Sequence, residues 1–421
     1  MGDGDAIPLS DEDRAILALE GRAVAGHTCK TIVVGAPAPG LEQLRELIGS
    51  RIDRVPALTR VLGGEPDEPA WVADPDFDVR CHVVPVSGPP VGEARLTEVV
   101  AGLFEQRLPR DRPLWQIDLV RIDDGRAALV WRLHHAIADG TSAMRFGRDL
   151  LWDEAADASG APRSGRRTTP PAHDDARRRG HLGAFIRREF GESRHRSPFD
   201  REVGPMRRIA FAAVPFQPLH DAARALCGAT VNDAVLAIVA GALRRWLEHH
   251  HGSLGSVRLR VPVSLHSEGD RAGNRDSFFT VPVSLHEPDP VLRLREVHAQ
   301  TAERKREHDA EQLERFLVEL GRASPRLERF AERIEAGARS FALAVSNVPG
   351  PPRPVSVLGT PVESMHSVAE IGRHHALRIA VVSIAGRLCF GFVADAAVVD
   401  DLGAMARGVE AEAAELVAVA R

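Results

Sequence analysis

The sequence predicts an α/β protein, in the broad sense of mixed α+β, with two lobes of similar size. The chain has 421 residues, enough for two domains at ~100–200 residues each. Segments with helical and with strand periodicity alternate in both halves, as expected where helices flank sheets. A stretch rich in Arg, Pro and Gly, residues 156–208, separates the halves, so we expect lobes at 1–155 and 209–421 with a basic linker between them.

In the first half, leucines recur at helical spacing over Leu41–Ile52 and Leu96–Leu108, which predicts two helices. The clearest strand covers residues 126–135, RAALVWRLHH. Side chains alternate along a strand, so His134 and His135 point to opposite faces of the sheet. One histidine can therefore face a cavity while the other packs into the structure.

The second half opens with a helix over Thr230–Glu248 that carries a continuous apolar stripe. The hexapeptide VPVSLH occurs twice, at 261–266 and 281–286, and predicts two short strands whose prolines lie at an edge or at a strand start. The remaining expected elements are a helical segment at 290–338, a strand at 341–346, a turn at NVPGPP, a pair of strands in ALRIAVVSIAGRLCFGFVAD and a helix from Asp400.

Composition excludes several classes of protein. The formal net charge is −5 and the pI is about 6.4, which gives no basis for nucleic-acid binding. The four cysteines never form a CxxC, so we expect no metal site and no disulfide framework. The acidic N-terminus does not resemble a secretory signal, and the longest apolar run, Ala234–Leu243, is about half of a membrane span. A cytoplasmic protein with at most peripheral membrane contact is expected.

The basic segment Arg163–Arg208 holds 13 arginines and 6 acidic residues, an excess of seven positive charges. It is either a solvated linker with one short helix or a surface patch for anionic lipid or coenzyme phosphates. The second interpretation predicts peripheral contact with an anionic membrane or with lipid inclusions.

The stretch His134-His135-Ala136-Ile137-Ala138-Asp139-Gly140 lies between the expected strand and a helix. An imidazole that faces a cavity can take a proton from an alcohol, thiol or amine, because it titrates near neutral pH. Asp139 is placed to stabilise the turn or to pair with an arginine, and Gly140 allows close approach of backbone or substrate. Two adjacent histidines are more often structural, but the HHxxxDG pattern at such a junction is more specific.

Other blocks leave alternatives open. Thr230 is suited to cap a helix with Asp233 three residues on, whereas Asn232 either caps or orients a group between the lobes. Ser346 and Asn347 lie where a strand is expected to end, the usual place for binding residues. Trp115 either fills a core or lines an acyl pocket.

The HHxxxDG pattern of residues 134–140 resembles the signature of the chloramphenicol acetyltransferase-like, coenzyme-A-dependent acyltransferases. Further blocks resemble those of bacterial wax ester synthase/diacylglycerol acyltransferases, in the expected order and over nearly the whole chain. They are Pro113-Leu114-Trp115, the VND at 231–233, the strand–GN–strand region LRVPVSLHSEGDRAGNRDSFFTVPVSL and the SNVPGP at 346–351. One departure is Ile384, where that family usually has tyrosine.

The resemblance implies two acetyltransferase-like lobes with a tunnel between them. Acyl-CoA would enter as co-substrate from one side, and an alcohol acceptor, diacylglycerol or a long-chain alcohol, from the other; no cofactor is expected. His135 would act as general base, without a covalent acyl-enzyme. The catalytic motif would comprise His134, His135, Asp139 and Gly140, and the expected substrate-binding residues are Trp115, Asn232, Asp233, Ser346 and Asn347.

Three other functions compete with this one. The acceptor could be a hydroxyl or amine of a specialised metabolite, which the departures from the family pattern favour. A condensation-type enzyme would use a carrier-protein thioester in place of acyl-CoA. A non-catalytic binding module is the least consistent with the sequence, because His135, Asp139 and Gly140 are all retained.

Overall fold

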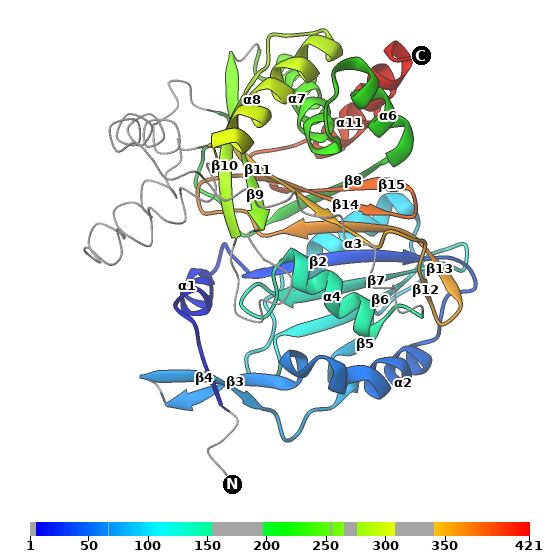
Figure 1. Cartoon of the computed structure of the whole chain (residues 1–421). Helices are drawn as coiled ribbons and strands as arrows, with labels where there is room; N and C mark the ends of the chain where they lie inside the picture. Colours follow the sequence, from blue (N-terminus) through cyan, green and yellow to red (C-terminus); the bar gives the residue numbers. More distant parts are fainter. Residues whose placement is uncertain (1–5, 66, 154–196, 253–254, 265–275, 308–340) are drawn as a thin grey trace.

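The computed structural model describes residues 6–65, 67–153, 197–252, 255–264, 276–307 and 341–421. Within them the chain forms two six-stranded sheets and one three-stranded sheet, flanked by helices. In Figure 1 one large sheet lies in the lower half of the molecule and the other lies above it, below the helices α6, α7, α8 and α11. Most of the basic stretch 156–208 and the expected helical residues 308–338 lie outside the described residues.

The first large sheet belongs to the N-terminal lobe and has the order β12-β13-β2-β7-β6-β5. Its strands are β2 (His27–Val34), β5 (Val83–Pro85), β6 (Trp115–Arg121), β7 (Ala127–His134), β12 (Ser356–Val357) and β13 (Thr360–Ala369). A small sheet of order β1-β4-β3 lies beside it, built from β1 (Ile7–Pro8), β3 (Arg60–Glu65) and β4 (Glu68–Ala73). The expected strand at 126–135 is confirmed as β7.

The helices of this lobe follow the predicted apolar spacing. They are α1 (Asp11–Leu19), α2 (Leu41–Arg51), α3 (Glu93–Phe104), α4 (Gly140–Leu150) and the short 3₁₀ turns Ile52–Arg54, Pro56–Thr59 and Val79–Cys81. Leu44, Leu47 and Ile48 of α2 are buried on one face of the sheet, and Leu96, Val100 and Phe104 of α3 on the other. The sheet is thus covered on both faces, and both expected helices are confirmed.

The second large sheet has the order β10-β9-β11-β14-β15-β8. Its strands are β8 (Arg207–Pro215), β9 (Ser256–Ser264), β10 (Asp276–Ser284), β11 (Leu343–Pro349), β14 (Leu377–Ile384) and β15 (Arg387–Asp395). The helices that pack on it are α6 (Phe216–Cys227), α7 (Val231–His250), α8 (Pro290–Glu307) and α11 (Leu402–Val419). The expected turn at NVPGPP is wrong in its first half, because Asn347, Val348 and Pro349 continue β11.

One strand crosses from the second half of the chain into the first sheet. β13 pairs with β2 in antiparallel register, with Ser367 opposite Lys30 and Met365 opposite Ile32. A division of the chain at residue 209 therefore does not describe the sheets, since residues 356–369 complete the N-terminal one. The local sequence of β13 gives its strand character but not its partner, so the exchange could not be predicted from periodicity.

The two sheets meet where β13 crosses β14 and β15. Gly391 of β15 lies against the backbone carbonyl of Ser367. Next to it, the imidazole Nδ1 of His366 lies 3.0 Å from the carbonyl oxygen of Phe390 and the ring stacks on Phe211 at 4.4 Å. Close backbone contact and side-chain packing together fix the angle between the lobes.

No single helix among the described residues is long and apolar enough to cross a membrane. The helices α6 and α7 are long and apolar enough only when they are taken together, and the pair is bent by 95°.

Replacing Gly391 with alanine should weaken the junction between the lobes. A Cβ at this position would overlap the Ser367 carbonyl, so we expect a loss of about 1–3 kcal/mol in the free energy of unfolding. Gly102→Ala in α3 is the matched control, because nothing lies within 4 Å of its Cβ position and alanine favours helix. Chemical denaturation of both variants checks this, and equal stability of the two would contradict the close contact.

Candidate active site

The two histidines of the motif lie at the end of β7 and face opposite sides of the sheet, as predicted. Trp131 and Leu133, which share the face of His135, pack in the core under α2 and α4. Val130, which shares the face of His134, packs in the core under α3. The backbone N–H of His134 donates to Leu114 and that of His135 donates to Gly26, at 3.0 Å each, so the start of the turn is fixed.

His134 is fully buried and both its ring nitrogens are engaged by the protein. Nδ1 accepts the backbone N–H of Ala136 at 3.1 Å, so Nε2 carries the proton and donates to Glu20 at 3.0 Å. Burial raises the pKa of the Glu20 carboxyl, but hydrogen bonds from His134 and Arg110 outweigh this and lower it below its ordinary value. The motif predicts His134 as part of the catalytic group. In the structure this residue holds the turn in place, with both ring nitrogens bonded within the protein.

His135 is partly exposed and directly follows the last residue of β7, five residues before α4 begins. Burial lowers its pKa to about 4, and the positive charge of Arg378 acts in the same direction. The imidazole is therefore neutral at physiological pH and can accept a proton.

Asp139 caps the helix that follows. It is buried, and its carboxylate accepts the backbone N–H of Ser142 at 2.6 Å, at the N-terminus of α4. The prediction that Asp139 stabilises the turn is confirmed. Its negative charge also raises the pKa of His135 and of the buried Lys30.

Gly140 lies at the contact between the lobes. A Cβ here would come 3.0 Å from Cγ2 of Val348 in β11. Among the described strands, β11 pairs with β9 only at Leu343 and Ala344, and beyond this point it continues beside β14 alone. Its free end therefore reaches α4, and close approach of the backbone explains the glycine.

Ser346 and Asn347 lie within β11, not after its end. Both are partly exposed. By alternation Ser346 shares the face of Val348, towards α4, while Asn347 lies on the opposite face. The structure brings Ser346 towards the histidine motif and does not bring Asn347 there.

Asp233 has a structural role in place of the expected substrate contact. Thr230 and Asp233 form the predicted capping box of α7, which is confirmed. The same carboxylate accepts the hydroxyl of Thr301 at 2.6 Å and lies 2.8 Å from Nδ1 of His298, both on α8. Its oxygens are occupied in joining two helices. Asn232, half-buried in the first turn, stays a predicted binding residue.

Trp115 is part of the packed core and not of a substrate pocket. Its side chain is 1% exposed, its indole N–H donates to Leu58 at 2.7 Å, and its ring stacks on His82 at 4.5 Å. Of the two alternatives that the sequence left open for Trp115, the structure supports the core.

Two charged residues near His135 were missed by the sequence analysis. Lys30 of β2 is 2% exposed, and its Nζ donates to the hydroxyl of Ser367 at 2.5 Å. Arg378 of β14 lowers the pKa of both His135 and Lys30. A lysine just before the apolar run Ile32–Val34 is a signal in itself, since the chain has one other lysine, Lys305.

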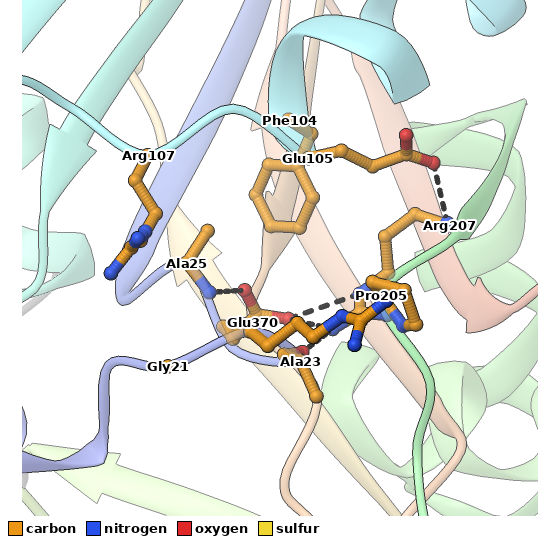
Figure 2. A pocket seen from close by; sticks show the side chains of 10 residues that line it. Gly21, Ala23, Ala25, Phe104, Glu105, Arg107, Pro205, Arg207 and Glu370 are labelled. Carbon is orange, nitrogen blue, oxygen red and sulfur yellow. Dashed lines mark hydrogen bonds and ion pairs between the residues drawn. The ribbon is translucent and has the colours of Figure 1, made fainter.

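Figure 2 shows a polar pocket of about 200 Å³ at the segment that follows Glu20. The buried carboxylate of Glu370 accepts the backbone N–H of Ala25 at 2.7 Å and pairs with Arg207 at 3.0 Å. Burial raises the pKa of Glu370 although Arg207 opposes this. The backbone N–H of Arg207 also donates to Glu105 at 2.7 Å, so these groups join the N-terminal segment to β8 of the other lobe.

Known proteins resemble this chain in sequence and in fold. The family model described as the wax ester synthase/diacylglycerol acyltransferase catalytic domain matches residues 9–191, and that of the WS/DGAT C-terminal domain matches residues 272–416. A putative diacylglycerol O-acyltransferase of Mycobacterium bovis is 30% identical over 367 residues, covering 79% of this chain and 80% of that protein. The chain belongs to the wax ester synthase/diacylglycerol acyltransferase family.

A probable diacylglycerol O-acyltransferase of Mycobacterium tuberculosis is 29% identical over 424 residues, covering 92% of this chain and 90% of that one. The solved wax ester synthase/diacylglycerol acyltransferase of Marinobacter aquaeolei VT8 matches with a TM-score of 0.72 at 23% identity, over 98% of this chain and 99% of that one. A starter condensation domain of rhizomide synthetase matches with a TM-score of 0.62 at 16% identity, over 97% and 94% of the two chains.

These matches confirm the two-lobed, acetyltransferase-like fold and make this protein an acyl-CoA-dependent acyltransferase. The tunnel between the lobes stays a prediction.

The capping role of Asp139 predicts different effects for two substitutions. Asp139→Ala removes the acceptor of the Ser142 N–H and should lower the free energy of unfolding by about 0.5–2 kcal/mol. Asp139→Asn keeps a capping oxygen and should be closer to wild type in stability. Thermal denaturation compares them, and if the two variants are equally destabilised the charge of Asp139 matters more than its hydrogen bond.

Proposed function

We propose that this acyltransferase moves an acyl group from acyl-CoA directly to the hydroxyl of an alcohol acceptor, with His135 as general base. The observation that carries the proposal is the position of His135. Its neutral, partly exposed ring directly follows the end of β7, and five residues on Gly140, at the start of α4, meets Val348 of β11 from the other lobe. A base at a junction between lobes can meet two substrates that arrive separately.

The reaction then proceeds in one displacement. His135 takes the proton of the acceptor hydroxyl as its oxygen attacks the thioester carbonyl carbon. The tetrahedral oxyanion collapses, the carbon–sulfur bond breaks and the thiolate of coenzyme A takes the proton back from the imidazolium. The ester and free coenzyme A leave, and the histidine is neutral again.

The surroundings of the site support transfer without a covalent acyl-enzyme. Cys29 is the cysteine next to Lys30 in the sequence, but it packs on the opposite face of β2, in the core under α3. Burial raises the pKa of its thiol to about 12, so a reactive thiolate does not form there.

The acceptor is proposed from the relatives, whose names describe diacylglycerol acyltransferases and a wax ester synthase. Diacylglycerol or a long-chain alcohol is therefore the first candidate. A hydroxyl or amine of a more polar metabolite is the second, and the buried Lys30 on the face of His135 favours it.

Contact with lipid is proposed to be peripheral. The basic segment Arg163–Arg208 supports it by its excess of seven positive charges, each of which can add ~1 kcal/mol near an anionic surface. Nearly all of this segment lies outside the described residues, so its role stays a prediction from sequence.

Replacing His135 with alanine should lower turnover by roughly 10²–10⁴-fold, the usual effect of losing a general base. The fold should persist, because the His135 side chain is partly exposed. The exposed His374 provides the control, and His374→Ala should keep wild-type activity. Release of free coenzyme A measures both variants, and near wild-type release by His135→Ala would remove His135 from the mechanism.

The low pKa of His135 predicts where activity is lost in acid. Below a pH of about 4 the imidazole is protonated and cannot accept the hydroxyl proton, so kcat/KM should fall through that value and not near 6.5. Removing the nearby charge in Arg378→Gln should move the midpoint upwards, because Arg378 lowers the pKa of His135. Brief pH-jump assays, with refolding controls at neutral pH, measure the profile. A wild-type midpoint near 6.5 would contradict a base whose charged form is disfavoured by its surroundings.

A further inference from the structure

Three side chains with hydrogen-bond donors lie on the same face of the first sheet as His135, further along β2 and β7. Lys30 of β2 lies opposite Trp131 of β7, and Thr28 lies opposite Leu133. Residues directly opposite in an antiparallel pair point to the same side, so these side chains share the face of Leu133 and His135. All three are deeply buried, at 2% exposed for Lys30, 1% for Trp131 and 3% for Thr28.

These side chains carry hydrogen-bond donors that the described part of the chain leaves largely unused. The indole N–H of Trp131 and the hydroxyl of Thr28 have no hydrogen-bond partner among the described residues. The ammonium of Lys30 has three donors and one hydrogen bond among those residues, to Ser367. A buried donor without a partner costs about 1–3 kcal/mol, so such a group in a native fold calls for an explanation.

The same charges act on Lys30 and on His135. Arg378 lowers the pKa of both side chains and Asp139 raises that of both, which places the lysine in the electrostatic surroundings of the site. Burial lowers the pKa of Lys30 to about 8, so its ammonium is still the main form at neutral pH. Around His135 there is thus a buried cation as well as a neutral base.

We propose that Lys30, Thr28 and Trp131 form an acceptor subsite, which binds a hydrogen-bond-accepting oxygen of the acceptor molecule at a distance from the hydroxyl that reacts. The subsite rests on the proposed function, since it assumes that an alcohol is held at His135. Its ligand class is an alcohol with a second oxygen group, such as a hydroxyl, ether or ester carbonyl, and not a plain alkanol.

The spacing along the sheet separates this subsite from the reacting carbonyl. Trp131 and His135 are four residues apart, which corresponds to about 13 Å at the rise of a β-strand. The carbonyl under attack must lie close to the hydroxyl that His135 deprotonates, and so the donors of Lys30 and Trp131 are too far along the strand to hold its oxyanion. They fit a more distant part of the same acceptor.

The burial of the subsite argues against the pantetheine arm of coenzyme A as its ligand. That arm must run from the thioester to a nucleotide that stays near solvent, so its amides belong in an open channel. The side chains of Lys30, Trp131 and Thr28 lie instead in the interior, between the sheet and the core under α2 and α4. Such a buried position suits a substrate that is enclosed as a whole.

The charge of Lys30 should also lower the stability of the fold, as is common for residues kept for function. An ammonium inside a buried strand is unfavourable by desolvation, and a lowered pKa means that folding disfavours its charged form. Lys30→Met keeps the length of the side chain and removes the charge. We expect this variant to have a melting temperature at neutral pH at or above that of the wild type.

The test compares plain 1-alkanols with alkanediols of the same length and varied spacing of the two hydroxyls. One acyl-CoA is used throughout, and initial rates of thiol release and product masses are recorded. Wild type should prefer the best diol by about tenfold or more, as one satisfied buried hydrogen bond allows. In Lys30→Met the ratio should fall towards one through loss of the diol rate, with the alkanol rate kept.

Two threonines on β2 supply a matched pair of variants. Thr28→Val removes a donor of the subsite and should reduce the diol preference. Thr31→Val is the same change on the same strand, but Thr31 faces the opposite side, where its hydroxyl contacts Cys29. It should leave the preference unchanged. If Lys30→Met fails to fold, this pair still tests the subsite.

Four results would overturn the proposal. They are an unchanged diol preference in Lys30→Met, a parallel loss of alkanol and diol rates, a rise in KM for acyl-CoA alone, or a lower melting temperature with normal acceptor preference. Failure of the proposed function looks different, since wild type would then release no thiol with any acceptor. In that case, thermal stabilisation by a diol without acyl-CoA still decides the subsite, because it should require Lys30.

Discussion

The pairing of β13 with β2 connects the two lobes and places the groups around the active site. β13 comes from the second half of the chain, and its residue Ser367 makes two contacts on which the site depends. The backbone carbonyl packs against Gly391 at the crossing of the two sheets, and the hydroxyl accepts a hydrogen bond from Lys30. β13 also contacts β14, the strand that carries Arg378, and the charge of Arg378 lowers the pKa of His135.

The two adjacent histidines have different surroundings because a strand presents alternate side chains to opposite faces. His134 is fixed by Glu20 and by the turn, which leaves it no free nitrogen. His135 stays partly exposed and neutral, since burial and Arg378 both disfavour its charged form. Asp139 then starts α4 at the point where β11 arrives from the other lobe. A fixed turn thus holds the neutral imidazole of His135 close to the contact between the two sheets.

Sequence periodicity predicted the elements next to the site, but not their long-range partners. β7, α2, α3 and α7 follow from local patterns, and so does the opposite orientation of His134 and His135. The exchange of β13 could not be predicted, because strand pairing across three hundred residues leaves no local signal. The same holds for Asp233, whose capping box is local but whose contacts to α8 are not. Lys30 was visible in the sequence, but only the register with β7 gives it a place beside the site.

The central claim is direct transfer of the acyl group between two bound substrates, with His135 as the only protein group that takes up the proton. The most direct measurement is the intact mass of the enzyme after rapid acid quench, with saturating acyl-CoA and no acceptor. The account predicts an unmodified chain under these conditions, and ester formation without delay once an acceptor is added. An increase in mass equal to the acyl group, formed and discharged at the rate of turnover, would contradict direct transfer and require a covalent acyl-enzyme.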